Sequence, residues 1–208
     1  MRGKGPGLLW ACVVLAAATV AATADPVAFT LETKDFSELG STGAATAAVV
    51  SDYAYGANFS GDVTSRAYTL DDGDYLYLYQ VDNQGPSALE VLGVQPFRGL
   101  LEGGRLTGGE PSDFLTGGYV PAGQSYDADL SEPLVSYQYP AYAGAHLPAG
   151  EHTVVLYLIS PYAPEMGEAY VIDGGTATVE AWVPVPEPAT GGLLALGAGL
   201  GLLRRRRR

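Results

Sequence analysis

The chain has 208 residues and a formal net charge of −12, and 47% of its residues are hydrophobic. Cys12 is its one cysteine, so the chain forms no internal disulfide, and the residues after Cys12 have no thiol for catalysis. Residues 25–183 hold four basic residues against 22 acidic residues, a formal charge of −18. Such a charge disfavours binding to nucleic acid and to anionic lipid, so no nucleic-acid partner is expected.

Residues 1–24 have the features of a secretory signal peptide. A basic N-terminus precedes an apolar run, and Ala22 and Ala24 form a small-x-small site. This arrangement predicts removal of the segment by signal peptidase, with the cut before Asp25. The apolar run is short for a membrane-spanning helix, and an uncleaved membrane anchor is the alternative interpretation.

Residues 25–183 are numerous enough for one domain with its own core, and their pattern is that of an all-β domain. Alternating apolar and aromatic residues, separated by Gly, Pro, Asp and Asn turns, predict strands at 27–33, 45–53, 65–70, 74–81, 88–94, 134–139, 152–160 and 175–183. Many short strands at such spacing predict an antiparallel β-sandwich, immunoglobulin-like or jelly-roll-like. A signal helix before it and a hydrophobic helix after it complete the predicted architecture.

Three segments give the most specific predictions within this domain. Both faces of 74–81 are largely apolar, so this strand is expected at the centre of a sheet. In 175–183 the small and apolar residues alternate with Thr and Glu, which predicts one buried face. Residues 99–133 are rich in Gly, Pro and Asp, which predicts a long connection with room for one hairpin.

The chain holds few residues that indicate catalytic chemistry. His146 and His152 are the only histidines, and the chain has no zinc-protease helix motif, phosphate-binding loop or Gly-x-Ser-x-Gly turn. We therefore expect a protein that is not an enzyme and has no cofactor. A hydrolase with two facing carboxylates is the lesser alternative, and its pattern carries little information among so many acidic residues.

Two groups of residues are candidate binding sites. Asp71, Asp72 and Asp74 form the densest acidic cluster, which favours either a calcium loop or a solvated turn that precedes a strand. All 14 tyrosines lie in 25–183, and a cluster of them predicts either glycan contacts or sandwich-edge tyrosines with buried rings; this cluster comprises Tyr137, Tyr139 and Tyr142. The glycan interpretation would make the domain a carbohydrate-binding module.

Residues 184–208 form a tail with three parts in fixed order. A proline-rich segment comes first, and its prolines are expected to exclude helix and sheet pairing. An uncharged Gly, Ala and Leu run follows, and from Ala189 it holds 15 residues, about 22 Å of helix, less than the ~30 Å of a bilayer core. Basic residues close the tail and are expected to stay on the cytoplasmic side; these are Arg204, Arg205, Arg206, Arg207 and Arg208.

This tail resembles the PEP-CTERM sorting signal of Gram-negative bacteria. The resemblance rests on the Pro-Glu-Pro motif before the apolar run and the arginines, and its residues are Val185, Pro186, Glu187 and Pro188. It implies that an exosortase, a membrane-embedded cysteine peptidase, recognises and processes the tail. A glycine-based tail for rhomboid-like proteases, starting at Gly191-Gly192, and a plain C-terminal membrane anchor are the alternatives.

The resemblance also implies a route and a destination. The protein would cross the inner membrane, remain in it transiently by its tail, and reach the cell surface or an exopolysaccharide matrix. Within that setting, we expect 25–183 to be a structural or adhesive domain. The resemblance covers only the tail, so the activity of the domain rests on its own residues.

Overall fold

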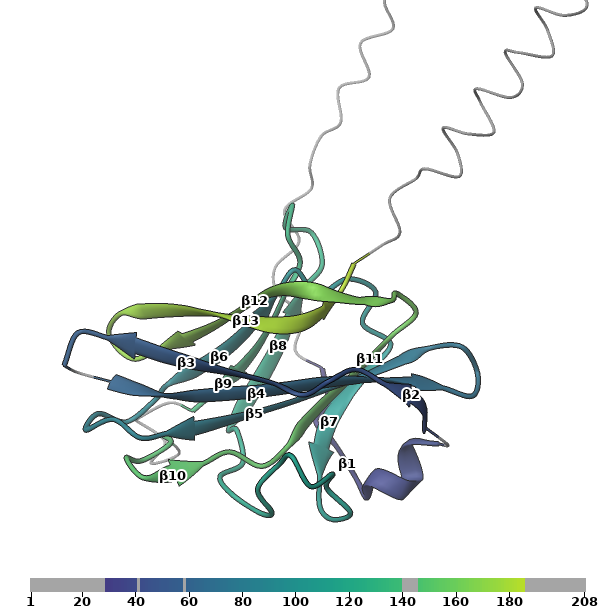
Figure 1. The fold of residues 1–208 in the computed structure, drawn as a ribbon. Helices are drawn as coiled ribbons and strands as arrows, with labels where there is room; N and C mark the ends of the chain where they lie inside the picture. Colours follow the sequence, from purple (N-terminus) through teal and green to yellow (C-terminus); the bar gives the residue numbers. More distant parts are fainter. Residues whose placement is uncertain (1–28, 41, 58, 140–145, 186–208) are drawn as a thin grey trace, which may run out of the picture.

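The computed structural model describes residues 29–40, 42–57, 59–139 and 146–185, which form two β-sheets (Figure 1). The signal helix, the cleavage-site residues Ala22 and Ala24, the hydrophobic C-terminal helix and Arg204 to Arg208 lie outside the described residues. Within the described ranges, no helix has both the length and the apolar character needed to cross a bilayer.

The larger sheet has eight strands, in the order β1-β7-β11-β5-β4-β2, with β3 also paired to β4 and β10 to β5. Its strands are β1 (Glu32–Lys34), β2 (Thr42–Ala45), β3 (Val49–Tyr55), β4 (Phe59–Leu70), β5 (Tyr75–Asn83), β7 (Glu102–Leu106), β10 (Glu151–His152) and β11 (Leu156–Ser160). The described pairs are antiparallel except β1–β7, which is parallel. The prediction of a wholly antiparallel arrangement is therefore wrong at this edge, where no hairpin fixes the direction of β1.

The smaller sheet has five strands in the order β13-β12-β6-β9-β8, and all of its pairs are antiparallel. Its strands are β6 (Val91–Gln95), β8 (Gly123–Asp127), β9 (Leu134–Gln138), β12 (Pro164–Ile172) and β13 (Thr176–Pro184). Along β13 the small and apolar residues are buried, and Thr176, Thr178 and Glu180 are exposed. The alternation predicted for 175–183 is thus confirmed.

The facing sides of the two sheets share one apolar core. Buried side chains from both sheets belong to it, among them Tyr77 and Tyr79 of β5, Val135 of β9 and Val171 of β12. The prediction of an all-β domain is confirmed, and its two sheets pack through this common core. Because large aromatic side chains fill the centre, the domain does not need a disulfide to reach a substantial buried apolar area.

A second apolar cluster covers part of the outer face of the larger sheet. Leu76 and Leu78 of β5 belong to it, together with Leu39 of the 3₁₀ helix η1 (Phe36–Leu39) and Phe114 of the β7–β8 connection. The helix begins with a capping box, in which Asp35 accepts a hydrogen bond from the Ser37 amide at 3.0 Å. Strand β5 is consequently buried on both faces, as its sequence predicts.

Three sequence predictions need correction. The strand predicted at 152–160 is interrupted, since β10 ends at His152 and β11 begins at Leu156. The connection predicted at 99–133 contains β7 and β8, which belong to different sheets and so form no hairpin with each other. Strand β12 was not predicted, because it begins with a proline and has a glycine at its centre.

Candidate functional site

The strand that leads to the C-terminal tail, β13, is held by both sheets. It pairs with β12 along its whole length, from Thr176 opposite Ile172 to Pro184 opposite Pro164. From the larger sheet, the Tyr79 hydroxyl donates to the Trp182 carbonyl at 2.5 Å, and the Ser51 hydroxyl donates to the Glu180 carbonyl at 2.9 Å. These bonds connect the edge strand of one sheet to the other sheet.

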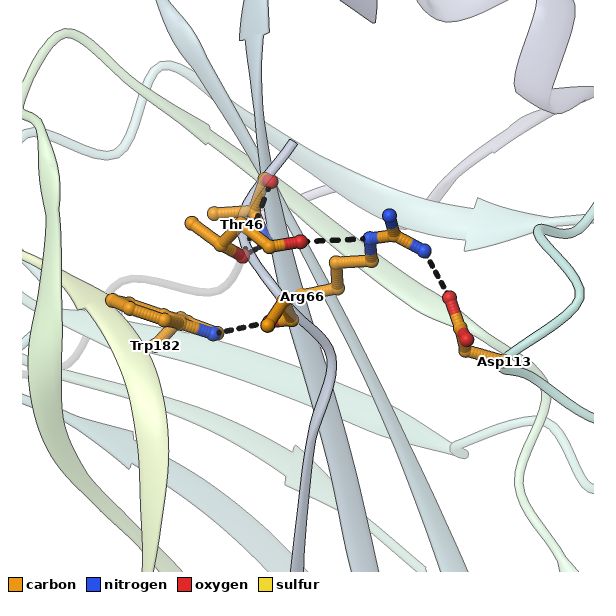
Figure 2. A network of polar contacts seen from close by, with 6 residues as sticks. Thr46, Arg66, Asp113 and Trp182 are labelled. Atoms are coloured by element: carbon orange, nitrogen blue, oxygen red, sulfur yellow. Dashed lines mark hydrogen bonds and ion pairs between the residues drawn. The ribbon is translucent and has the colours of Figure 1, made fainter. Parts of the chain in front are cut away.

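A polar network around Thr46 adds to this attachment (Figure 2). The Trp182 indole donates to the Ala47 carbonyl at 3.0 Å, and the Trp182 amide donates to the Ser65 hydroxyl at 3.1 Å. In Figure 2, Arg66 extends between Thr46 and Asp113: its Nε donates to the Thr46 carbonyl at 3.1 Å, and it forms an ion pair with Asp113. The segment between β2 and β3 is therefore fastened to β4 and to β13.

The tail leaves the domain with no spacer after this strand. Pro184 is still in register with Pro164, and the Val185 amide donates to the Ala163 carbonyl at 3.2 Å. Val185 also packs against the main core. The prediction that the prolines of this segment exclude sheet pairing is wrong for Pro184, because two prolines face each other at the end of the ladder, where neither needs an N–H donor.

Residues 184–208 match the family model described as the PEP-CTERM protein-sorting motif. The chain carries this sorting motif. The motif marks an exported protein that an exosortase recognises and that is processed at the membrane and delivered to the surface. Of its residues, Val185 lies in the described part and Pro186, Glu187 and Pro188 lie outside it. No curated protein and no solved structure matches the chain.

The two described members of the tyrosine cluster offer no exposed ring surface to a sugar. Tyr137 and Tyr139 are both fully buried in the main core, so neither ring can stack on a sugar at the surface. The Tyr137 hydroxyl donates to the Tyr157 carbonyl, at 3.4 Å. Of the two interpretations of these tyrosines, their burial supports that of buried rings: Tyr137 in β9 and Tyr139 directly after β9 both belong to the main core. Tyr142 lies outside the described residues.

The acidic cluster at residues 71–74 forms the turn between β4 and β5. The Asp74 amide donates to the Asp72 carboxylate at 3.0 Å, and Gly73 has a φ of 94°, a value that favours glycine. Asp71 and Asp72 are exposed. Among the described residues, no group of three or more acidic, His or Cys side chains is arranged to hold a metal ion. The geometry is that of the solvated turn rather than of a calcium loop.

A pocket of about 330 Å³ opens between β1 and β7 of the larger sheet and β8 of the smaller sheet. Two partly buried aromatic side chains and two carboxylates are part of its wall, and its full lining is Phe29, Thr30, Glu32, Leu100, Leu101, Glu102, Gly103 and Tyr126. No local pattern in the sequence predicts this pocket, because its residues come from three separate segments, and two of the strands are short or glycine-rich.

Glu102, at the rim of this pocket, is part of a polar network. It forms an ion pair with Lys34 and accepts a hydrogen bond from the Tyr157 hydroxyl at 2.6 Å. Burial acts to raise the pKa of Glu102, but the bonds from Lys34 and Tyr157 act against it, and the net result is a lowered pKa. A glycosidase acid needs the opposite shift, so this carboxylate does not fit that role.

A row of three aspartates crosses the outer face of the larger sheet. Asp52 of β3 lies opposite Asp62 of β4, and Asp62 lies opposite Asp82 of β5. The Gln84 amide donates to Asp62 at 2.7 Å and to Asp82 at 3.0 Å. Partial burial, a hydrogen bond with Asp52 and the charges of Asp52 and Asp82 raise the pKa of Asp62. Neither salt bridge found among the described residues reaches this row.

Proposed function

We propose that the chain is a non-enzymatic surface or matrix protein, in which a β-sandwich is displayed outside the cell after its sorting tail has been processed. The sandwich corresponds to residues 25–183, with a structural or adhesive role in an exopolysaccharide matrix. Signal peptidase removes 1–24, and the tail then spans the inner membrane transiently, with Arg204 to Arg208 on the cytoplasmic side.

One observation carries this proposal: the sorting motif follows a strand that both sheets hold in place. Trp182 lies two residues before Pro184. Its carbonyl accepts a hydrogen bond from the Tyr79 hydroxyl, and its amide donates one to the Ser65 hydroxyl. A domain attached in this way remains folded up to the first residue of the motif. Processing of the tail therefore releases or transfers an intact domain, as a displayed structural protein requires.

The test is the replacement of Pro186, Glu187 and Pro188 by alanine in a host that carries an exosortase. We expect the variant to remain in the inner membrane in a longer form, measured by fractionation and by the size of the protein on a gel. The matched control replaces the Glu110-Pro111 pair of the β7–β8 connection by alanines. Normal size and location of the motif variant would show that the tail does not act as a sorting signal.

A carbohydrate-binding role is the second candidate, and the pocket favours it. Phe29 and Tyr126 supply aromatic surface, and Glu32 and Glu102 supply oxygens that accept hydrogen bonds from sugar hydroxyls. On an array of neutral oligosaccharides we expect binding that Tyr126→Ala removes and that Tyr162→Ala, outside the pocket, retains. Equal binding by the two variants would exclude the pocket as a sugar site. The absence of binding by the parent chain would exclude it as well.

A further inference from the structure

Several exposed apolar side chains lie at the end of the domain from which the tail leaves. Among the described residues, nine large apolar side chains are exposed. Four of them belong to this end, where β5, β7 and β12 begin and β13 ends: Leu101 at 58% exposed, Met166 at 44%, Leu130 at 43% and Tyr162 at 37%. Scattered exposed apolar residues are normal, but four of them at one end of a domain indicate an interaction surface.

Hydrogen bonds connect these segments into one surface. The loop before β7 is bound to the loop before β9 by the Phe97 amide, which donates to the Pro133 carbonyl at 2.6 Å, and by Arg98, which donates to the Ser131 carbonyl at 2.9 Å. The Tyr162 ring occupies the space beside Gly99, where a Cβ would come within 2.7 Å of it.

The same surface is continuous with the point where the tail leaves. Tyr162 is followed by Ala163, whose carbonyl accepts the Val185 amide, and then by Pro164, which pairs with Pro184. Met166 lies opposite Trp182, two residues further from the exit. We call this region the exit surface; it consists of residues 96–101, 128–133, 161–166 and 182–185. Its exposed apolar side chains thus lie at the same end of the domain as the start of the sorting motif.

The length of the tail sets the distance between the exit surface and a membrane. At most five residues, 186–190, separate Val185 from the apolar run, whether the run is counted from Ala189 or from Gly191. Fully extended, five residues reach at most about 17 Å. The polar layer on one side of a bilayer is roughly 5–8 Å thick. With the tail inserted, the start of the motif therefore stays within about 10 Å of the headgroup surface, which limits how far the exit surface can move from the membrane.

The charges of the exit surface and its surroundings select the kind of lipid. Arg98 is its one cation, whereas several carboxylates lie on or next to it, namely those of Asp127, Asp129, Glu132, Glu165 and the 71–74 turn. Anionic headgroups would be repelled by these carboxylates. Zwitterionic headgroups, such as phosphatidylethanolamine, carry an ammonium group that the carboxylates attract, and they admit apolar side chains at the interface.

We propose that the exit surface seats on zwitterionic lipid headgroups while the tail is in the membrane, with Leu101, Leu130, Tyr162 and Met166 at headgroup depth. This inference rests on the proposed insertion of the tail. Seating would hold the Pro-Glu-Pro motif at a fixed height above the bilayer, next to a peptidase that is itself embedded in it. The motif has no spacer of its own, so the domain surface sets its position.

The experiment uses single nitroxide labels on the full chain in phosphatidylethanolamine–phosphatidylcholine vesicles. Cys12→Ser removes the native thiol, and one cysteine is then placed at Leu101→Cys or Leu130→Cys. Thr176→Cys, at the opposite end of β13, is the matched control, and Ala195→Cys reports insertion of the tail. Collision rates with oxygen, which partitions into lipid, and with a water-soluble nickel chelate give the depth of each label.

We expect the oxygen-to-nickel ratio at Leu101→Cys and Leu130→Cys to be several-fold above that at Thr176→Cys, and to fall when phosphatidylglycerol replaces part of the lipid. The inference alone would be overturned if the label at Ala195→Cys is exposed to lipid while the labels at Leu101→Cys and Leu130→Cys give the same oxygen-to-nickel ratio as Thr176→Cys. A wet label at Ala195→Cys would overturn the insertion of the tail as well. If the labels at Leu101→Cys and Leu130→Cys are shielded from the nickel chelate only when the peptidase is present in the vesicle, the surface contacts that protein and the lipid proposal is overturned.

Discussion

Carboxylates at two places on the eight-stranded sheet have opposite surroundings. One place is near the exit end, and the other is on the outer face toward the opposite end of the domain, which we call the far end. Near the exit end, Glu102 has a cation and a hydroxyl as partners, Lys34 and Tyr157. Toward the far end, Asp62 lies between two other aspartates in register and is bonded to an amide, that of Gln84. The first arrangement lowers the pKa of its carboxyl and the second raises it.

The high acidity of the domain is therefore not one uniform property. A paired carboxylate near the exit contributes to stability, whereas three aligned aspartates oppose it. The exit end also exposes apolar side chains, which a soluble domain gains nothing by exposing. The exposed apolar side chains at the exit end and the charged row away from it fit the proposed arrangement, in which one end of the domain faces a membrane and the rest faces water. Substitutions that remove these carboxylates in the two regions should therefore change the stability of the domain in opposite directions.

Gly61→Ala should disrupt the far end most strongly. A Cβ at Gly61 would overlap the carbonyl oxygen of Asp82 and the ring of Tyr53, whose hydroxyl passes over this position. We expect the free energy of unfolding in urea to fall by about 3 kcal/mol or more, because backbone and a buried ring must both shift. Gly123→Ala is the control, since its Cβ would meet only the flexible Gln138 side chain. Equal stability of the two variants would contradict this close packing.

Tyr79→Phe should loosen the strand that carries the tail. The Tyr79 hydroxyl is buried and donates to the Trp182 carbonyl, which the substitution leaves without this partner. We expect a loss of about 1–2 kcal/mol in the free energy of unfolding, and faster amide hydrogen exchange in β13 than in β9. Tyr170→Phe removes an exposed hydroxyl that donates to Glu168, and should change stability by less than about 0.5 kcal/mol. Similar exchange in β13 of both variants would refute the attachment.

Glu102→Gln should remove a stabilising charge near the exit. Because the folded pKa of Glu102 is lowered, its contribution is present above the unfolded pKa of about 4.3 and is lost as the pH falls through the folded value. We expect a loss of about 1 kcal/mol at neutral pH that disappears on acidification, measured by urea unfolding across the pH range. Lys34→Met should give the same pH dependence. A loss that persists at acid pH would mean that packing, not charge, is responsible.

Asp62→Asn should act in the opposite direction. The folded pKa of Asp62 is raised, so its ionisation destabilises the fold as the pH rises above the unfolded pKa of about 3.9. We expect a gain of about 0.5 kcal/mol at neutral pH that vanishes on acidification, because the like charges of Asp52 and Asp82 then lose their effect. The control, Asp173→Asn in the β12–β13 turn, lies outside the row. Destabilisation by Asp62→Asn at neutral pH would contradict the repulsion between like charges along the row.

The sequence predicts those strands in which the strand's own residues show the alternation of buried and exposed side chains. In β5 and β13 the alternation of side chains is local, and the burial of both strands follows from it. Strands β7 and β12 have glycines where partner side chains occupy the space: a Cβ at Gly104 would overlap Tyr157, and one at Gly167 would overlap Val183. These glycines lower the strand signal, and their reason lies in residues far away in the chain.

The same distinction separates the sites. The sorting tail is recognisable from sequence because its parts follow one another along the chain. The pocket and the exit surface combine segments that are distant in sequence, so only the fold brings them together. Tyr137 and Tyr139 show the limit of a local pattern: their clustering allows either an exposed platform or buried rings, and the packing of the two sheets selects the buried rings.

The mass of the protein recovered from the cell surface tests the central claim most directly. If an exosortase processes the tail, intact-mass spectrometry will show a chain that begins at Asp25, retains β13 and lacks Arg204 to Arg208. Its free energy of unfolding should equal that of the full chain, because the strand before the motif is held by both sheets. A surface form that retains all five arginines would contradict the account.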